Sequence, residues 1–193
     1  MRRLAQEAQS PFSGTRLGEI TSYNPATYSA KVMIQPDGYE TGWLPIMAAM
    51  IGQGWGLLAA PSIGDHAVVS FEHGDPESGL VMGFIPSDAQ RPGAPPSGEL
   101  WLTHQTGSTL KLTNDGKVLV SANTDLTLTA AGKVIVNSTG DTNLTVGGQL
   151  NATVTGKAVV TASEIDLVGN TKVTGNLDVS AILRVGGVTV TVP

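Results

Sequence analysis

Two histidines with carboxylates beside them are the residues of this chain best suited to bind a metal ion. His66 and His73 flank a strand-like run, and Asp65, Glu72 and Asp75 lie next to them. Imidazole and carboxylate groups are common ligands of zinc. A spacing of seven residues, however, puts the two histidines on opposite faces of a straight strand, because side chains alternate between faces. We therefore expect solvated strand-end and loop residues here, without a metal site.

Serines near these histidines raise the possibility of nucleophilic catalysis. Ser62, Ser70 and Ser78 are close to them in sequence, but a serine nucleophile needs a base oriented by a third group, usually on a sharp turn such as the nucleophile elbow. No such motif is present. The chain also has no cysteine, so it offers no thiol nucleophile or thiolate site. We expect no catalytic residues, no enzyme activity and no bound cofactor.

Aspartates recur through the second half of the chain, where they could suggest calcium binding. They are Asp125, Asp141, Asp166 and Asp178. A calcium-binding nonapeptide repeat begins with GGxGxD, and only Gly147-Gly148 and Gly186-Gly187 start in that way. Aspartate is also a common turn residue, because its side chain hydrogen-bonds to the local backbone. The sequence favours corner residues over calcium ligands.

Charge and composition exclude several other classes of protein. The 193 residues carry a formal net charge of −5, which disfavours a nucleic-acid partner. The N-terminal MRRLAQEAQS lacks the apolar run of a secretory signal, and the apolar segment Trp43 to Ile51 is too short to span a bilayer. We expect a soluble protein made in the cytoplasm without a signal peptide.

A sharp change of composition near residue 100 predicts two structural regions. All aromatic residues lie at or before Trp101, and all prolines except Pro193 at or before Pro96. After an N-terminal arm (1–14), the first region (15–86) shows five strand-like runs separated by turns, with a glycine-rich loop at 52–56. The runs are 15–24, 28–35, 42–47, 66–74 and 79–85. Five short strands with glycine-rich connections predict an all-β barrel of the OB type.

A proline-rich linker (87–98) and a connecting hairpin (99–116) lead to the most regular part of the chain. Residues 117–164 read as six lines of eight: KVLVSANT, DLTLTAAG, KVIVNSTG, DTNLTVGG, QLNATVTG and KAVVTASE. Apolar residues alternate in each line, which predicts a short strand, and glycine or asparagine at the line ends predicts a corner. The inward-facing set is Val118, Val120, Leu126, Leu128, Val134, Val136, Leu144, Val146, Leu150, Val154 and Val160.

The apolar phase changes after this segment. Ile165, Leu167 and Val173 are odd-numbered, whereas the earlier set is even. A shift of one residue turns every side chain of a strand over, so a bulge or extra corner is expected near Ser163 and Glu164. Residues 165–193 are therefore predicted to form a separate C-terminal section. Within the octads, Leu119, Ile135 and Val159 are apolar on the outward phase, and the sequence does not show whether anything covers them.

Eight residues per corner are too few for one chain to enclose its own core. Three copies wound about a common axis would supply three edges per layer, with the inward valines and leucines meeting at the centre. This reasoning predicts an obligate homotrimer whose second region is an intertwined, triple-stranded β-helix.

The most specific segments resemble the baseplate assembly protein V, or central spike, family of contractile phage tails and R-type tailocins. They are GEITSYNPATYSAKVMIQPDGYETGWLPIM, GQGWGLLAAPSIGDHAVVSFEHGDPESGLVMGFIPSD and GELWLTHQTGSTLKLTNDGKV. The resemblance implies an N-terminal OB domain, a C-terminal trimeric β-helix and a place in the tail baseplate of the virion. It further implies contacts with hub and tail-tube proteins, and passage through the host outer membrane on sheath contraction.

One family feature is missing from this chain. Many members end in a His-x-His pair that holds an iron ion at the trimer tip, but no histidine follows His104. Iron is therefore not expected, and a separate cap protein on the tip is a hypothesis. An envelope- or carbohydrate-binding module is the alternative function, although the repeats lack the aromatic residues that stack on sugars. A cell-wall hydrolase, as fused into some spikes, is disfavoured because no inserted domain is present.

Overall fold

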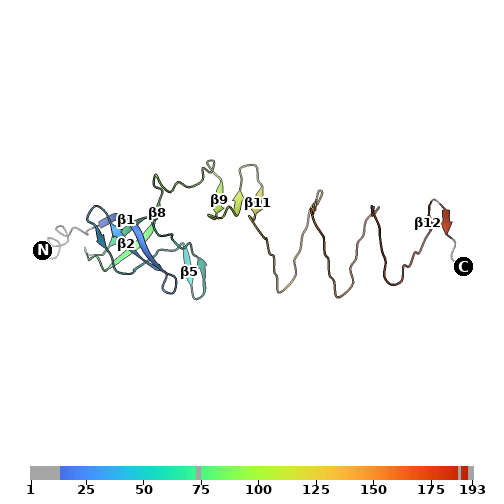
Figure 1. Cartoon of the computed structure of the whole chain (residues 1–193), viewed down its shortest axis with the longest axis horizontal. Helices are drawn as coiled ribbons and strands as arrows, with labels where there is room; N and C mark the ends of the chain where they lie inside the picture. The colour runs from blue at the N-terminus through green and yellow to red at the C-terminus, as the bar shows by residue number, and fades with distance from the viewer. Residues whose placement is uncertain (1–13, 73–74, 187, 191–193) are drawn as a thin grey trace. The chain divides into compact units, whose positions relative to one another are not determined.

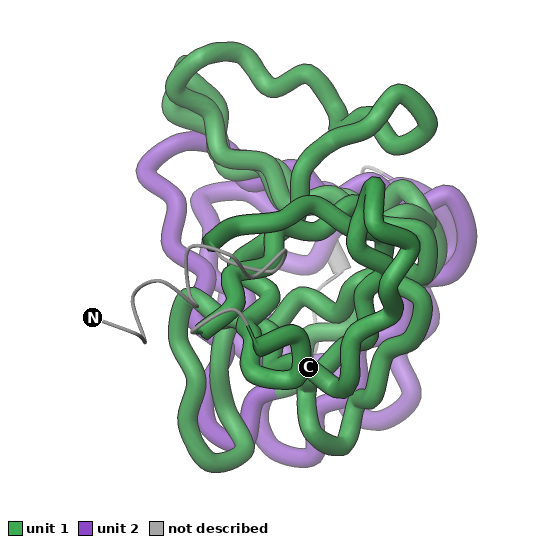
Figure 2. Tube along the Cα trace, turned by 90° about the vertical axis from the view of Figure 1, so that its left-hand side faces the viewer, with its two compact units in different colours: residues 1–129 green, residues 130–193 purple. Residues whose placement is uncertain are grey.

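The computed structural model describes residues 14–72, 75–186 and 188–190. The chain divides into two compact units between Thr129 and Ala130, coloured green and purple in Figure 2. Residues 1–13 of the predicted arm lie outside the described residues, and Gly14 is the first residue of β1. All regular elements of the described residues are strands, so the fold is all-β.

The first unit is built on a curved antiparallel sheet (Figure 1). Its order is β3-β2-β1-β7-β8, with β4 also paired to β2. The parallel bridge between Ile46 and Val81, together with a 2.8 Å hydrogen bond from Met47 N–H to the Val81 carbonyl, joins the end of β4 to β8. These contacts close the sheet into a barrel. The strands are β1 (Gly14–Asn24), β2 (Ser29–Ile34), β3 (Tyr39–Glu40), β4 (Leu44–Pro45), β7 (His66–Phe71) and β8 (Gly79–Ile85).

The barrel core comes from strict alternation along its strands. Buried and less buried residues alternate along β7, where Ala67, Val69 and Phe71 are buried. Along β2, Ala30, Val32 and Ile34 are buried and alternate with less buried residues in the same way. The buried hydrophobic residues are Ile20, Ala30, Val32, Ile34, Leu44, Ile46, Ala67, Val69, Phe71 and Val81. Each fully buried aliphatic side chain contributes about 1.5–3 kcal/mol to folding. All ten of these residues lie in the barrel, between Ile20 and Val81.

The structure confirms most of the predicted strands and corrects two details. Of the predicted third strand at 42–47, only Leu44–Pro45 forms a ladder, with β2, and Ile46 adds the isolated bridge to Val81. A proline has no N–H to continue a ladder. The predicted loop at 52–56 is instead a hairpin of β5 (Met50–Gly52) and β6 (Trp55–Leu57). Its turn uses Gly54 at φ +76°, and the Trp55 ring lies so close to Gly52 that a Cβ there would be 2.3 Å from it.

A three-stranded antiparallel meander follows the proline-rich stretch, as the sequence predicts. It consists of β9 (Leu100–Thr103), β10 (Thr109–Leu112) and β11 (Val118–Ser121). Gly107 (φ +92°) and Gly116 (φ +79°) occupy left-handed turn positions between the strands. Lys111 lies opposite Trp101 in the register, with its Nζ 3.8 Å from the ring centroid, which is a cation–π contact.

After β11 the chain is extended and bends at regular intervals, without paired strands until its end. The bends lie at 123–124, 131–132, 139–140, 147–148 and 155–156, eight residues apart. Only the first octad contains a ladder strand within this chain, and the strands predicted in the other five, which are expected to pair between copies, stay a prediction. An extended segment needs a neighbour to form a ladder, and within one chain these segments have none. A terminal hairpin of β12 (Leu183–Val185) and β13 (Val188–Val190) follows.

From Ser163 onward the bend spacing is six residues instead of eight. Bends occur at 163, 169, 175 and 180–181. The corresponding sequence lines are EIDLVG, NTKVTG, NLDVSA and ILRVGG, which we call the hexads (residues 164–187). The phase change expected near Ser163 and Glu164 therefore coincides with a change of repeat length. The extended runs shorten from six residues to five or four, and the bends at 163, 169 and 175 are one residue long.

Candidate functional site

The extended segment 123–182 has every side chain exposed within one chain. The inward-facing set ranges from 43% exposed at Val146 to 77% at Leu128 and Val136. Val118 and Val120 lie on β11 opposite Leu112 and Leu110, and Leu126 lines the same hollow as Val120. The members from Leu128 onward lie on the extended segment, which has no paired strand. The outward apolar residues Leu119, Ile135 and Val159 are likewise exposed. An apolar surface of this extent typically marks an interaction site.

The backbone of the same segment is also unpaired. Between 123 and 182, no N–H or C=O group bonds to another described backbone group. The hydrogen bonds found there are from Asn123 N–H to Ser108 Oγ at 3.2 Å and from the Ser138 hydroxyl to the Gly140 carbonyl at 3.1 Å. Extended segments with two open edges are templates for pairing with other strands. Backbone and side chains therefore both present an open assembly surface.

Surface area leads to the same conclusion. The chain exposes 16237 Å², whereas a compact monomer of its 19.9 kDa mass is expected to expose roughly 8,700 Å². The excess is carried mainly by the segment after β11, where exposed valines, leucines and isoleucines recur in nearly every line. Covering this surface requires other protein chains.

The β5–β6 hairpin is a second exposed apolar surface, in the first unit. Met50, Ile51, Trp55 and Leu57 are 55–62% exposed. They alternate with glycine or lie beside it, so the hairpin has little polar side-chain surface. Its only strand pairing among the described residues is between β5 and β6 themselves.

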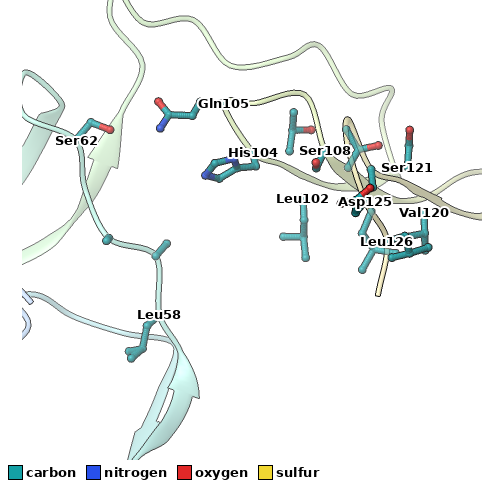
Figure 3. Close-up of a pocket in the computed structure, with 16 residues that line it drawn as sticks. Leu58, Ser62, Leu102, His104, Gln105, Ser108, Val120, Ser121, Asp125 and Leu126 are labelled. Atoms are coloured by element: carbon teal, nitrogen blue, oxygen red, sulfur yellow. The ribbon is translucent and has the colours of Figure 1, made fainter. Parts of the chain in front are cut away.

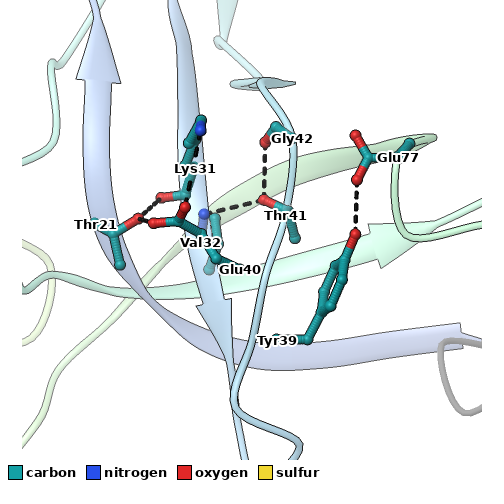
Figure 4. A network of polar contacts seen from close by, with 8 residues as sticks. All are labelled: Thr21, Lys31, Val32, Tyr39, Glu40, Thr41, Gly42 and Glu77. Atoms are coloured by element: carbon teal, nitrogen blue, oxygen red, sulfur yellow. Dashed lines mark hydrogen bonds and ion pairs between the residues drawn. The ribbon is translucent and has the colours of Figure 1, made fainter.

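Polar side chains fix the short strand β3 and the residues after it to the barrel (Figure 4). The hydroxyl of buried Thr41 accepts a 3.0 Å hydrogen bond from Val32 N–H and donates one of 2.9 Å to the Gly42 carbonyl. Thr21 donates to Glu40 at 2.7 Å, and Tyr39 donates to Glu77 at 2.7 Å. The hydrogen bond to Glu77 and partial burial raise the pKa of Tyr39 above its ordinary value. These contacts position β3 and the residues after it.

A carboxylate at the β10–β11 turn is held in its charged form. Asp115 accepts hydrogen bonds from Lys117 Nζ and from the Thr113 hydroxyl. The bond from Lys117, and then that from Thr113, lowers the pKa of Asp115. Thr113 N–H also donates to the Lys117 carbonyl at 3.1 Å. The turn that delivers the chain to the first octad is therefore tied by side chains as well as by Gly116.

The residues considered for chemistry do not form a catalytic or metal-binding group. His66 is exposed on β7, opposite Glu19 and Ile85, while His73 lies outside the described residues. Ser62 and His104 line the same hollow of about 830 Å³ in the first unit (Figure 3), but no hydrogen bond joins their side chains. His104 Nδ1 instead lies 2.8 Å from Thr106 Oγ1. Residues 14–72, 75–186 and 188–190 contain no group of three or more histidines or carboxylates placed to hold a metal ion.

The closed barrel of short antiparallel strands, with its core inside residues 16–85, defines an OB domain. Comparison with protein families is more specific: residues 16–85 match the model of the Type VI secretion system/phage-baseplate injector OB domain. The match covers 70 of the 193 residues, confirms the resemblance to the baseplate protein V family and supports a role in a baseplate or injector assembly. No curated protein matches the chain. None of the described segments forms a helix capable of crossing a bilayer.

Proposed function

We propose that the protein is the central spike of a contractile phage tail, a homotrimer that is driven through the host outer membrane. The observation that carries this proposal is the segment 123–182, which is extended, apolar on alternate residues, and unpaired along its whole backbone. In the chain it follows an injector OB domain, from which the proline-rich linker and the β9–β11 meander separate it. A long apolar segment that cannot fold alone, attached to a baseplate domain, fits a shared shaft.

Three copies can pair the backbone and bury the apolar side chains of the segment 123–182, which one copy does not do. Bends every eight residues allow each octad to form one side of a three-sided shaft, with each edge paired to a strand of another copy. The inward set then fills the centre: Val118, Val120, Leu126, Leu128, Val134, Val136, Leu144, Val146, Leu150, Val154 and Val160. Every backbone group obtains a partner, as the interior of a protein requires. The result is an intertwined, triple-stranded β-helix.

Intertwining suits a part that must withstand compression. To leave such a shaft, a copy must break its backbone hydrogen bonds to both of the other copies in many successive layers. Dissociation is therefore slow even where the equilibrium stability is modest. The OB domains would form a wider collar for the hub and tail-tube proteins. We place the assembled protein in the virion baseplate, with synthesis in the host cytoplasm.

The function proposed is mechanical and not enzymatic. The serines and histidines are not arranged as a nucleophile and its base, and the chain lacks the histidine pair that would hold a tip iron. We therefore propose a spike without a catalytic centre, cofactor or metal, whose tip is covered by a separate cap protein. An envelope-binding module is the competing outcome, which binding to isolated cell envelopes without tail assembly would favour.

The test is the assembly state and shape of the purified full-length protein. Sedimentation equilibrium should give three times the chain mass, circular dichroism should show β-structure beyond that of the OB domain, and electron microscopy should show a rod with a three-fold collar. A folded monomer with the segment after residue 122 still protease-sensitive would overturn the proposal.

A further inference from the structure

The charged residues of the repeats follow a regular pattern that the proposed spike function does not explain. From residue 117 onward they occur only at the first position of an octad, at the third position of a hexad, and at Glu164 where the two meet. They are Lys117, Asp125, Lys133, Asp141, Lys157 and Glu164, then Asp166, Lys172, Asp178 and Arg184. In both sets the sign alternates from one repeat to the next, with neutral Gln149 standing between Asp141 and Lys157.

The structure places these residues at equivalent points. Asp125, Lys133, Asp141 and Lys157 each directly follow a bend, so they all begin an extended run. Each is exposed and makes no ion pair with a described residue of its own chain. An extended run of eight residues covers up to roughly 26 Å, so successive charges are too far apart to meet within one run.

Winding of three copies brings them together. In the proposed shaft, each copy moves on to the next side of the shaft with every octad. On any one side, the octad of one copy is therefore followed by the next octad of a different copy, and these two strands are stacked. Stacked strands lie about 4.8 Å apart, within reach of a lysine–carboxylate pair. Lys133 of one copy then lies between Asp125 and Asp141 of its two neighbours. The same geometry places Lys172 between Asp166 and Asp178 in the hexads.

We propose that these residues form two ladders of ion pairs between copies, and that the ladders set the register in which the copies wind. The occupant of this surface is a second copy of the chain, and charge complementarity at every step identifies it. The inference rests on the trimer proposed above.

The ion pairs are needed to fix the register, because the apolar core alone does not distinguish one register from another. Every octad carries valine or leucine at its second or fourth position, and three of the six carry one at both, so a slip of one octad still places aliphatic residues in the core. The same slip puts lysine beside lysine and aspartate beside aspartate along the octad ladder, and like charges on adjacent strands are destabilising. A single exposed pair has a small effect. The penalty is repeated three-fold at each step, which favours the correct register over its alternatives.

Charge reversal in the full-length protein tests the ladder. Lys133→Asp places three aspartates in succession, and we expect its yield of trimer on refolding at low salt to fall several-fold. Recovery is expected near 1 M salt, where the screening length is about 3 Å. The control is Asn137→Asp, which adds a negative charge to the same octad but off the ladder, and it should refold within twofold of the parent. Adding Lys117→Gln, Asp125→Lys and Asp141→Lys to Lys133→Asp removes all like neighbours and should restore the yield.

Zero-length crosslinking tests the contacts directly. A carbodiimide activates a carboxylate, which then forms an amide with an amine in contact with it, so Lys133 should be joined to Asp125 or Asp141. In trimers refolded from unlabelled and isotope-labelled chains, the crosslinked peptides should include mixed-label pairs. Equal yields for Lys133→Asp and Asn137→Asp, or a trimer without mixed-label crosslinks at Lys133, would refute the ladder while leaving the spike intact. A monomeric parent protein would refute the spike itself.

Discussion

Replacing an inward valine of the third octad with lysine tests the shaft most directly. Val136 is 77% exposed in one chain and is expected to be buried in the trimer. Burying a valine fully contributes at least about 1.5 kcal/mol, so 77% of it contributes at least about 1.2 kcal/mol per copy, or about 3.5 kcal/mol per trimer. Val136→Lys loses this term and also brings three unpaired ammonium groups to the axis, which costs several kcal/mol more for each.

The expected result is loss of trimer with retention of the OB domain. Sedimentation velocity should show monomer or heterogeneous aggregate, while the tryptophan fluorescence of the first unit remains native-like. Asn137→Lys is the matched control, since it introduces the same charge one residue further along, on the outward phase, and should form trimer normally. If Val136→Lys assembles as well as Asn137→Lys, the assignment of inward and outward faces is wrong.

Three further predictions concern the OB domain, the meander and the tip. Thr41→Val should destabilise the OB domain by about 1–3 kcal/mol in chemical denaturation, because the buried Val32 N–H loses its acceptor, whereas Thr41→Ser should cost less. The folded-state pKa of Asp115 is lowered, so its contribution to stability is present above the unfolded pKa and is lost as the pH falls through the folded value. Asp115→Asn should therefore remove part of the acid-side decline in thermal midpoint, and an unchanged pH profile would contradict the role given to Lys117. Elemental analysis of the purified trimer should find no stoichiometric iron, and one iron per trimer would show that other residues replace the missing histidines.

The strands of the barrel could be predicted because their signals are local. Alternation in the runs of β2 and β7, and turn residues such as Asn24-Pro25 and Asp37-Gly38, determine each strand within a few residues of sequence. The β5–β6 hairpin was missed because its glycines suggest a loop. The signal that could have identified it is the turn glycine Gly54, with Met50 and Ile51 shortly before it and Trp55 and Leu57 shortly after it.

The repeats show the opposite relation between sequence and structure. The inward set is plain from the period of two, but a strand is defined by hydrogen bonds to a neighbour, and one chain contains no neighbour for most octads. The hexads were visible in the sequence as four aligned lines, yet the change of apolar phase was interpreted only as a bulge or corner. The bend positions show that the repeat itself becomes shorter.

The shortening of the repeat from eight residues to six has a mechanical meaning in a three-sided shaft. Two fewer residues reduce each side by roughly 6.6 Å at about 3.3 Å per residue. If the cross-section scales as the square of the side, the area falls to about 0.56 of its octad value, so the same axial force produces about 1.8 times the stress. If the protein is the proposed spike, the hexads, which follow the octads in the chain, would concentrate the thrust of a contracting tail on a smaller area than the octads.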